Sequence, residues 1–160
     1  MKIIATTLIA LTLVGCAAQP EKIVTTASGW PEVEITTSNK QAVKENLIQR
    51  NSANGWNLEQ ESDSSLLFTR VDDSGSFNSA LTQAMIGNSY STQPKYEARY
   101  IISNNSGKVK VVVNVAVSTQ MAFGQVNRVF LNKNNATFNA YQTQLYKVKS
   151  EIEGITSSGK

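Results

Sequence analysis

The chain of 160 residues contains no histidine and only one cysteine. Without histidine it cannot build a histidine-assisted serine or cysteine nucleophile. Histidine metal sites are excluded for the same reason, and one cysteine supplies neither a multi-thiolate metal site nor an intramolecular disulfide. We therefore expect a protein that is not an enzyme and that has no cofactor and no metal.

The excess of positive over negative charge is also small, with a formal net charge of +3. The basic residues are scattered along the chain, and no run of them resembles a nucleic-acid patch. Aromatic residues make up 8% and are not interleaved with basic ones, which argues against a stacking platform for bases. No glycine-rich phosphate loop is present. We expect a solvated surface and no nucleic-acid partner.

A hydrophobic leader opens the chain. Met1-Lys2 is a short positive segment, and the 12 residues from Ile3 to Val14 are apolar apart from three threonines. A membrane-spanning helix needs about 20 residues, so this segment is typical of a signal peptide. Removing residues 1–15 leaves a length that suits one domain.

Leu13-Val14-Gly15-Cys16 resembles the lipobox of bacterial lipoproteins. The resemblance implies cleavage between Gly15 and Cys16 and attachment of lipid to the Cys16 thiol, which explains the lone cysteine. Several acyl chains hold a protein on a membrane far more firmly than one. Ala17 and Ala18 lack the aspartate that marks inner-membrane retention in enterobacteria, so the expected location is the periplasmic face of the outer membrane. The alternative is an ordinary signal peptide that happens to contain a cysteine.

The mature chain divides into three parts. Residues 16–28 are small and polar and predict a flexible tether that carries the lipid. Residues 29–154 predict a single domain, and residues 155–160 predict a disordered tail.

The first half of the domain predicts a strand at 32–35, a helix at 38–54 and a hairpin. Ser38 with Gln41 forms a capping-box pattern, and Gly55 is placed to end the helix in a left-handed conformation. The hairpin strands are expected at 57–61 and 66–71, with the apolar second strand central in the sheet. A short helix at 77–86 and a loop at 87–94 follow.

The second half predicts a hairpin with strands at 95–103 and 109–121, joined by a turn at 104–107. Alternate valines from Val109 to Val117 share one face, which is expected to be core. Residues 126–131 suit either an extended arm or a final edge strand. The last helix is expected at 134–153, with Asn134 or Asn135 as its cap and a core-facing stripe at Phe138, Tyr141, Leu145, Val148 and Ile152.

The element order β-α-β-β-(α)-β-β-α predicts an α+β fold, a two-layer sandwich with helices on one face of an antiparallel sheet. This order is similar to helix-grip modules of outer-membrane assembly lipoproteins, which is an analogy of fold alone. The mature chain, including Gly29-Trp30-Pro31, also resembles a family of small proteobacterial lipoproteins. That resemblance implies no particular activity.

Two segments are candidate binding surfaces. The first is 77–94, with Met85 and Tyr90, because loops on a rigid scaffold often bind ligands; a short helix that closes the sheet edge is the alternative. The second is Gln120–Arg128, with Phe123, which could pair with a partner strand or cover an edge. The carboxylate pairs Glu32 with Glu34 and Glu59 with Glu61 are expected to share strand faces as solvent-facing charges.

We therefore expect a non-enzymatic lipoprotein, anchored to the membrane through lipid on Cys16, with a binding or scaffolding role in the periplasm. An envelope protein is the expected partner, and the pattern says nothing about oligomeric state. The alternative is a carrier of a lipid or another small ligand, with a groove between the last helix and the sheet.

Overall fold

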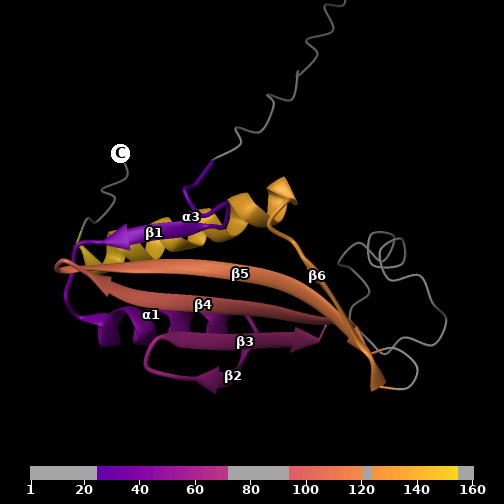
Figure 1. Ribbon diagram of the computed structural model, residues 1–160. Helices are drawn as coiled ribbons and strands as arrows, with labels where there is room; N and C mark the ends of the chain where they lie inside the picture. Colours follow the sequence, from indigo (N-terminus) through magenta and orange to yellow (C-terminus); the bar gives the residue numbers. More distant parts are fainter. Residues whose placement is uncertain (1–24, 72–93, 121–123, 155–160) are drawn as a thin grey trace, which may run out of the picture.

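The computed structural model describes residues 25–71, 94–120 and 124–154. Within these ranges two helices lie on the same side of one antiparallel sheet (Figure 1). The α+β two-layer fold is confirmed. The elements in order are β1 (Glu32–Ile35), α1 (Lys40–Ala53), β2 (Asn57–Glu61), β3 (Ser65–Val71), β4 (Lys95–Asn105), β5 (Lys108–Gln120), β6 (Val126–Phe130) and α3 (Asn135–Ile152).

Within the described residues the sheet has six strands, and three of them, β1, β4 and β6, pair with β5. The main order is β1-β5-β4-β3-β2, and β6 pairs with β5 as well. Strand β1 lies opposite Val109–Val112 of β5, and β6 lies opposite residues 116–120. The two short strands therefore share one edge of β5. Strand β3 is interior, as expected, but β4 is the middle strand of the main order, because β2 is the only described strand beyond β3.

The core lies between the sheet and the two helices. The predicted valine face is buried, with none of its five residues more than 6% exposed. Phe68 and Tyr100 pack edge to face at 5.6 Å between ring centroids, a favourable aromatic geometry. The α3 stripe is confirmed: Phe138, Leu145 and Val148 are buried, while Tyr141 and Ile152 are partly buried against the same core.

Helix α1 starts later than the pattern suggests. The capping-box expectation for Ser38 is wrong, because Asn39 is the N-cap and its side chain accepts a hydrogen bond from Ala42 N at 3.0 Å. Asparagine is at least as good an N-cap as serine. The C-terminal expectation is met: Gly55 has φ of 75°, and Trp56 N donates to Asn51 O as in a Schellman motif.

The β4–β5 connection is shorter than predicted. Strand β4 continues to Asn105, so Ser106 and Gly107 alone form the turn. Both have positive φ, 47° and 79°, as a two-residue turn matched to the twist of a hairpin requires. Residues 126–130 form an edge strand rather than a free arm.

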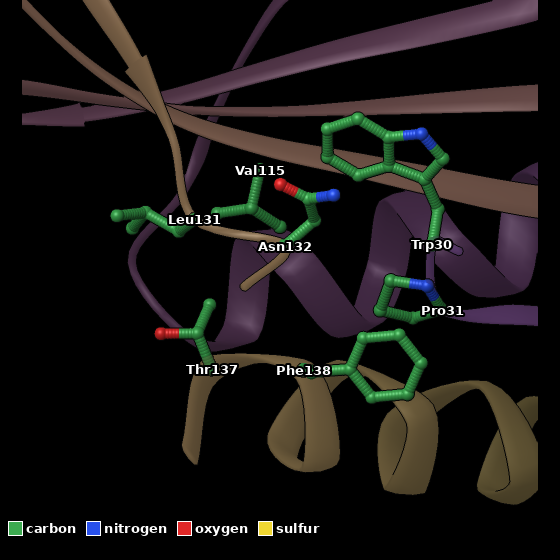
Figure 2. A pocket seen from close by; sticks show the side chains of 7 residues that line it. All are labelled: Trp30, Pro31, Val115, Leu131, Asn132, Thr137 and Phe138. Carbon is green, nitrogen blue, oxygen red and sulfur yellow. The ribbon is translucent and has the colours of Figure 1, made fainter. Parts of the chain in front are cut away.

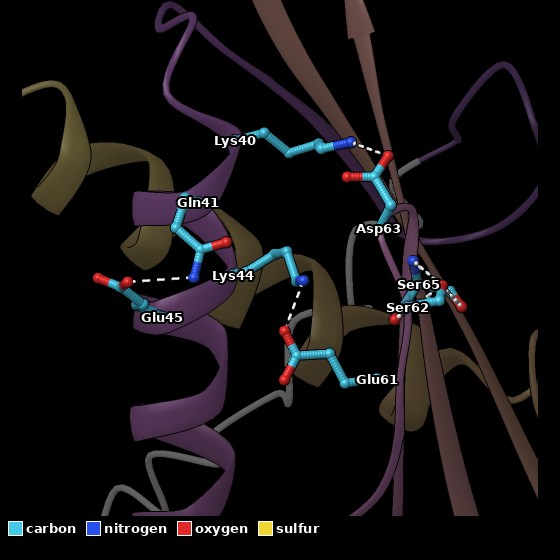
Figure 3. A network of polar contacts seen from close by, with 8 residues as sticks. All are labelled: Lys40, Gln41, Lys44, Glu45, Glu61, Ser62, Asp63 and Ser65. Atoms are coloured by element: carbon cyan, nitrogen blue, oxygen red, sulfur yellow. Dashed lines mark hydrogen bonds and ion pairs between the residues drawn. The ribbon is translucent and has the colours of Figure 1, made fainter.

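Two ion pairs hold α1 against the β2–β3 hairpin (Figure 3). Lys40 Nζ lies 2.6 Å from Asp63 Oδ2, and Lys44 Nζ lies 2.5 Å from Glu61 Oε1. The Asp63 side chain is 89% exposed, so its pair contributes little. Lys44 is 8% exposed at its side chain, and removing Glu61 would leave that buried charge without its partner.

Side chains of α3 cover the outer backbone edge of β1. Gln142, which is 2% exposed, accepts from Glu32 N at 3.0 Å and donates to Glu32 O at 2.9 Å. Further along, Lys149 Nζ donates to Glu34 O, and Glu153 accepts from Thr36 N. Hydrogen bonds from Lys149 and from the Thr36 backbone lower the pKa of Glu153 from 4.5 to about 2. Helix α3 therefore satisfies this edge as a further strand would.

Replacing Gln142 with leucine keeps the helix propensity but leaves Glu32 N–H and C=O without partners. Unpaired buried polar groups cost about 1–3 kcal/mol each, so the free energy of unfolding should fall by roughly 2–3 kcal/mol in urea titrations. Gln49→Leu, at an exposed position of α1, is the control and should change stability by less than about 0.5 kcal/mol. Equal effects of the two changes would contradict the role assigned to Gln142.

Candidate interaction surface

The sheet face opposite the helices is termed the open face. Side chains alternate across a strand, so this face receives the even-numbered residues of β5 and the odd-numbered residues of β4. Two ion pairs on it join the neighbouring strands β1 and β5, Glu32–Lys110 at 3.1 Å and Glu34–Lys108 at 3.6 Å. Two more reach across an intervening strand: Glu97–Arg128 at 2.8 Å across β5 and Glu59–Lys95 at 2.7 Å across β3. The face is therefore charged but locally neutral.

These contacts change the acidity of two carboxyl groups. Burial would raise the pKa of Glu32, but hydrogen bonds from Ser28 and Lys110 outweigh it and lower that pKa. A hydrogen bond from Lys95 lowers the pKa of Glu59. Both groups stay ionised near neutral pH, as partners in ion pairs.

The expectation that Glu59 and Glu61 share a strand face is wrong. The β2–β3 register shifts between Leu58 and Gln60, and such a bulge interrupts the alternation of side chains. Glu59 pairs with Lys95 on the open face, whereas Glu61 pairs with Lys44 of α1.

Apolar side chains lie exposed among these ion pairs. Ile101 is 43% exposed, Phe130 52% and Val126 63%, and the register places all three on the open face. Arg99 is exposed beside them, and no carboxylate within the described ranges forms an ion pair with it. Mixed apolar and basic side chains on the face of a sheet suit a protein partner better than a small ligand.

The three outer edges of the sheet differ in their protection. The edge of β1 is covered by α3, as described above. Strand β2 is exposed along its whole length but carries Glu59, Glu61 and a bulge, which are devices that oppose edge-to-edge pairing. Strand β6 has no bulge in its register with β5 and carries one charged residue, Arg128.

The backbone of β6 points half of its polar groups away from the sheet. Leu131 N donates to Val115 O at 2.9 Å, and hydrogen-bonded positions alternate along an antiparallel pair. Asn127 and Val129 therefore bond to β5, while the N–H and C=O groups of Val126, Arg128 and Phe130 face outward. No described residue pairs with this outer side of β6.

A small depression lies where β1 and β6 meet on β5 (Figure 2). It encloses about 150 Å³, including open solvent, but is too narrow for a water molecule. Its lining residues are Trp30, Pro31, Val115, Leu131, Asn132, Thr137 and Phe138. Trp30 also contacts Phe130 edge to face at 5.5 Å. Farther along α3, Leu145 and Val148 are fully buried against the sheet, where a carrier would need a groove.

The residues predicted as site residues lie outside the described part of the chain. This holds for Gly15, Cys16, Met85, Tyr90 and Phe123. Of the segment Gln120–Arg128, the structure places residues 126–128 in the edge strand β6. Phe130 and Ile101 were not predicted from the sequence as exposed residues. A strand over 126–130 places Phe130 on the same face as Arg128, and this period of two was the available signal for Phe130.

Comparisons with known protein families, with curated proteins and with solved structures find no match to this chain. Neither α1 nor α3, the helices of the described ranges, combines the length with the hydropathy that crossing a membrane requires. Among the same residues, no group of three or more histidine, cysteine, aspartate or glutamate side chains is placed to hold a metal ion.

Hydrogen exchange should show a two-residue alternation along β6. We expect the amides of Asn127, Val129 and Leu131 to exchange at least about tenfold more slowly than those of Val126, Arg128 and Phe130, because only the first set bonds to β5. Amide-resolved NMR exchange measures this directly. Uniform protection of all six amides would show that the outer side of β6 is already paired.

Proposed function

We propose that this chain is a lipid-anchored protein of the bacterial cell envelope that binds or scaffolds another protein in the periplasm and catalyses no reaction. The lipid is carried by Cys16, and the outer membrane is the proposed location. The observation that carries the binding role is the open face together with the outer edge of β6, with which no described residue pairs. An exposed edge strand is a template for pairing with another chain.

The distribution of protection over the sheet supports a binding role. The β1 edge is covered by α3 and the β2 edge is charged and bulged, while β6 presents exposed Val126 and Phe130. Edge protection is the rule in proteins that avoid association. Among the described residues, only the outer edge of β6 lacks such protection, and a specific partner would require an accessible edge of this kind.

The packing of α3 favours this proposal over a carrier of small ligands. A carrier needs an apolar cavity of some hundreds of Å³. Leu145 and Val148 fill the space between α3 and the sheet, and the depression beside Phe138 is too narrow for a water molecule, so neither place offers such a cavity within the described part of the chain.

The anchor is tested by metabolic labelling with palmitate. The full chain should incorporate label and fractionate with membranes, whereas Cys16→Ala should lose the label, because the only thiol is gone. Cys16→Ser is a matched control for the size of the side chain and should behave like Cys16→Ala. Equal labelling of all three chains would contradict lipid attachment at Cys16.

The binding role is tested in living cells by placing a photo-crosslinking amino acid at Ile101 on the open face or at Gln49 on α1. Both positions are exposed, so reactivity is matched. We expect discrete crosslinked protein products from position 101 and none from position 49. Identical patterns at both positions, or none at either, would refute a partner on the open face.

A further inference from the structure

We infer that the protein partner presents a carboxylate side chain to Arg99, in the middle of the open face. Arg99 lies on β4, the middle strand of the main order, and its side chain is exposed. This inference rests on the proposed binding function and names the chemical group that the partner supplies.

Among the described residues, the charges of the open face are balanced except at Arg99. The four ion pairs described above use every described carboxylate of this face and leave the Arg99 guanidinium without one. The other described arginines each have a partner: Arg50 pairs with Glu151, Arg128 pairs with Glu97, and Arg70 lies over the Trp56 ring at 5.2 Å from its centroid. Arg99 therefore differs from them in its surroundings.

The carboxylate next to Arg99 on the same strand face is already fully engaged. Glu97 Oε2 lies 2.8 Å from the Arg128 guanidinium, and Glu97 Oε1 accepts a hydrogen bond from Ser118 Oγ at 2.7 Å. The residues directly opposite Arg99 are Leu67 on β3 and Asn114 on β5, and neither carries a charge. Within the described ranges, an anionic acceptor for Arg99 has to come from another molecule.

A partner on the open face cannot avoid Arg99. Ile101, which is 43% exposed, follows Arg99 by two positions and projects from the same face, about 7 Å further along the strand. A partner that buries Ile101 thus also removes the guanidinium from water. A buried charge without a counter-charge is strongly unfavourable, whereas a carboxylate accepts two parallel hydrogen bonds from a guanidinium. The partner therefore needs a carboxylate at this point.

A single uncompensated charge distinguishes this partner from other anionic surfaces. Nucleic acids and anionic membranes bind through several basic groups at once, but Lys95, Lys108 and Lys110 on this face are each paired with a glutamate. A second copy of this chain packed face to face would bring only carboxylates that are already paired, together with a second Arg99. A foreign segment with its own aspartate or glutamate is the occupant that the charges favour.

The test measures the yield of crosslinked product from position 101 in living cells, using the lipid-anchored full chain and its Arg99 variants. Arg99→Glu should lower the yield at least about tenfold, because two carboxylates would then face each other. Arg99→Gln, which removes only the charge, should lower it about three- to tenfold, and Arg99→Lys should keep at least about a third. Lys133→Glu makes the same change in net charge as Arg99→Glu at an exposed residue between β6 and α3, and should leave the yield within about twofold.

A charge exchange identifies the carboxylate itself. Mass spectrometry of the crosslinked product should find an aspartate or glutamate of the partner beside the crosslink, and replacing that residue with lysine should restore crosslinking to Arg99→Glu. A variant that merely fails to fold cannot recover in this way. Full yield from Arg99→Glu and Arg99→Gln, a crosslinked segment without an acidic residue, or a second copy of this chain as the product would overturn the inference.

The two proposals fail differently in this experiment. A foreign protein crosslinked equally well with every Arg99 variant contradicts the carboxylate and leaves the binding role standing. The absence of any product from position 101 contradicts the binding role itself, and the inference about Arg99 falls with it.

Discussion

Strand β5 is 13 residues long, and every other part of the sheet depends on its pairing. One of its edges is matched residue by residue to β4 over 11 positions. The other edge is divided between β1 and β6, with Val113 bonded to Pro31 and Val115 bonded to Leu131. Because two short strands meet there, the entry of the chain into the domain and the approach to α3 lie side by side at Trp30 and Phe130.

The pairing of both β1 and β6 with one edge of β5 determines how the outer backbone edge of each short strand is covered. Helix α3 follows β6 directly and runs back along β1, so its side chains reach the β1 backbone through Gln142, Lys149 and Glu153. The same helix cannot cover β6, since it starts only five residues after that strand ends. Within the described ranges the outer edge of β6 therefore stays uncovered as a consequence of connectivity, and Val126 and Phe130 lie exposed on that strand.

Much of the fold was predictable because local periodicity carried it. The alternate valines of β5 predicted a buried face, and the 3-4 spacing in α3 predicted its core stripe. Gly55 predicted the end of α1, and Asn134 with Asn135 predicted the start of α3, where the structure has Asn134 as the N-cap. The misses were also local: Asn39 competed successfully with Ser38 as cap, and a bulge in β2 separated Glu59 from Glu61. Neither the choice of Asn39 as cap nor the bulge in β2 changes the spacing of apolar residues, so that spacing could not predict them.

The sequence by itself determined the fold class, the buried valine face of β5 and the absence of histidine chemistry, because these follow from composition and from repeats within one element. It also carries the lipobox-like segment, from which the proposed anchor at Cys16 follows. Only the tertiary structure decided that β1 and β6 share one edge of β5, that Gln142 stands in for a strand partner 110 positions away, and that no described residue pairs with the outer edge of β6. Those facts depend on contacts between distant segments, and the hydrogen bonds of an edge exist only once its neighbours are in place.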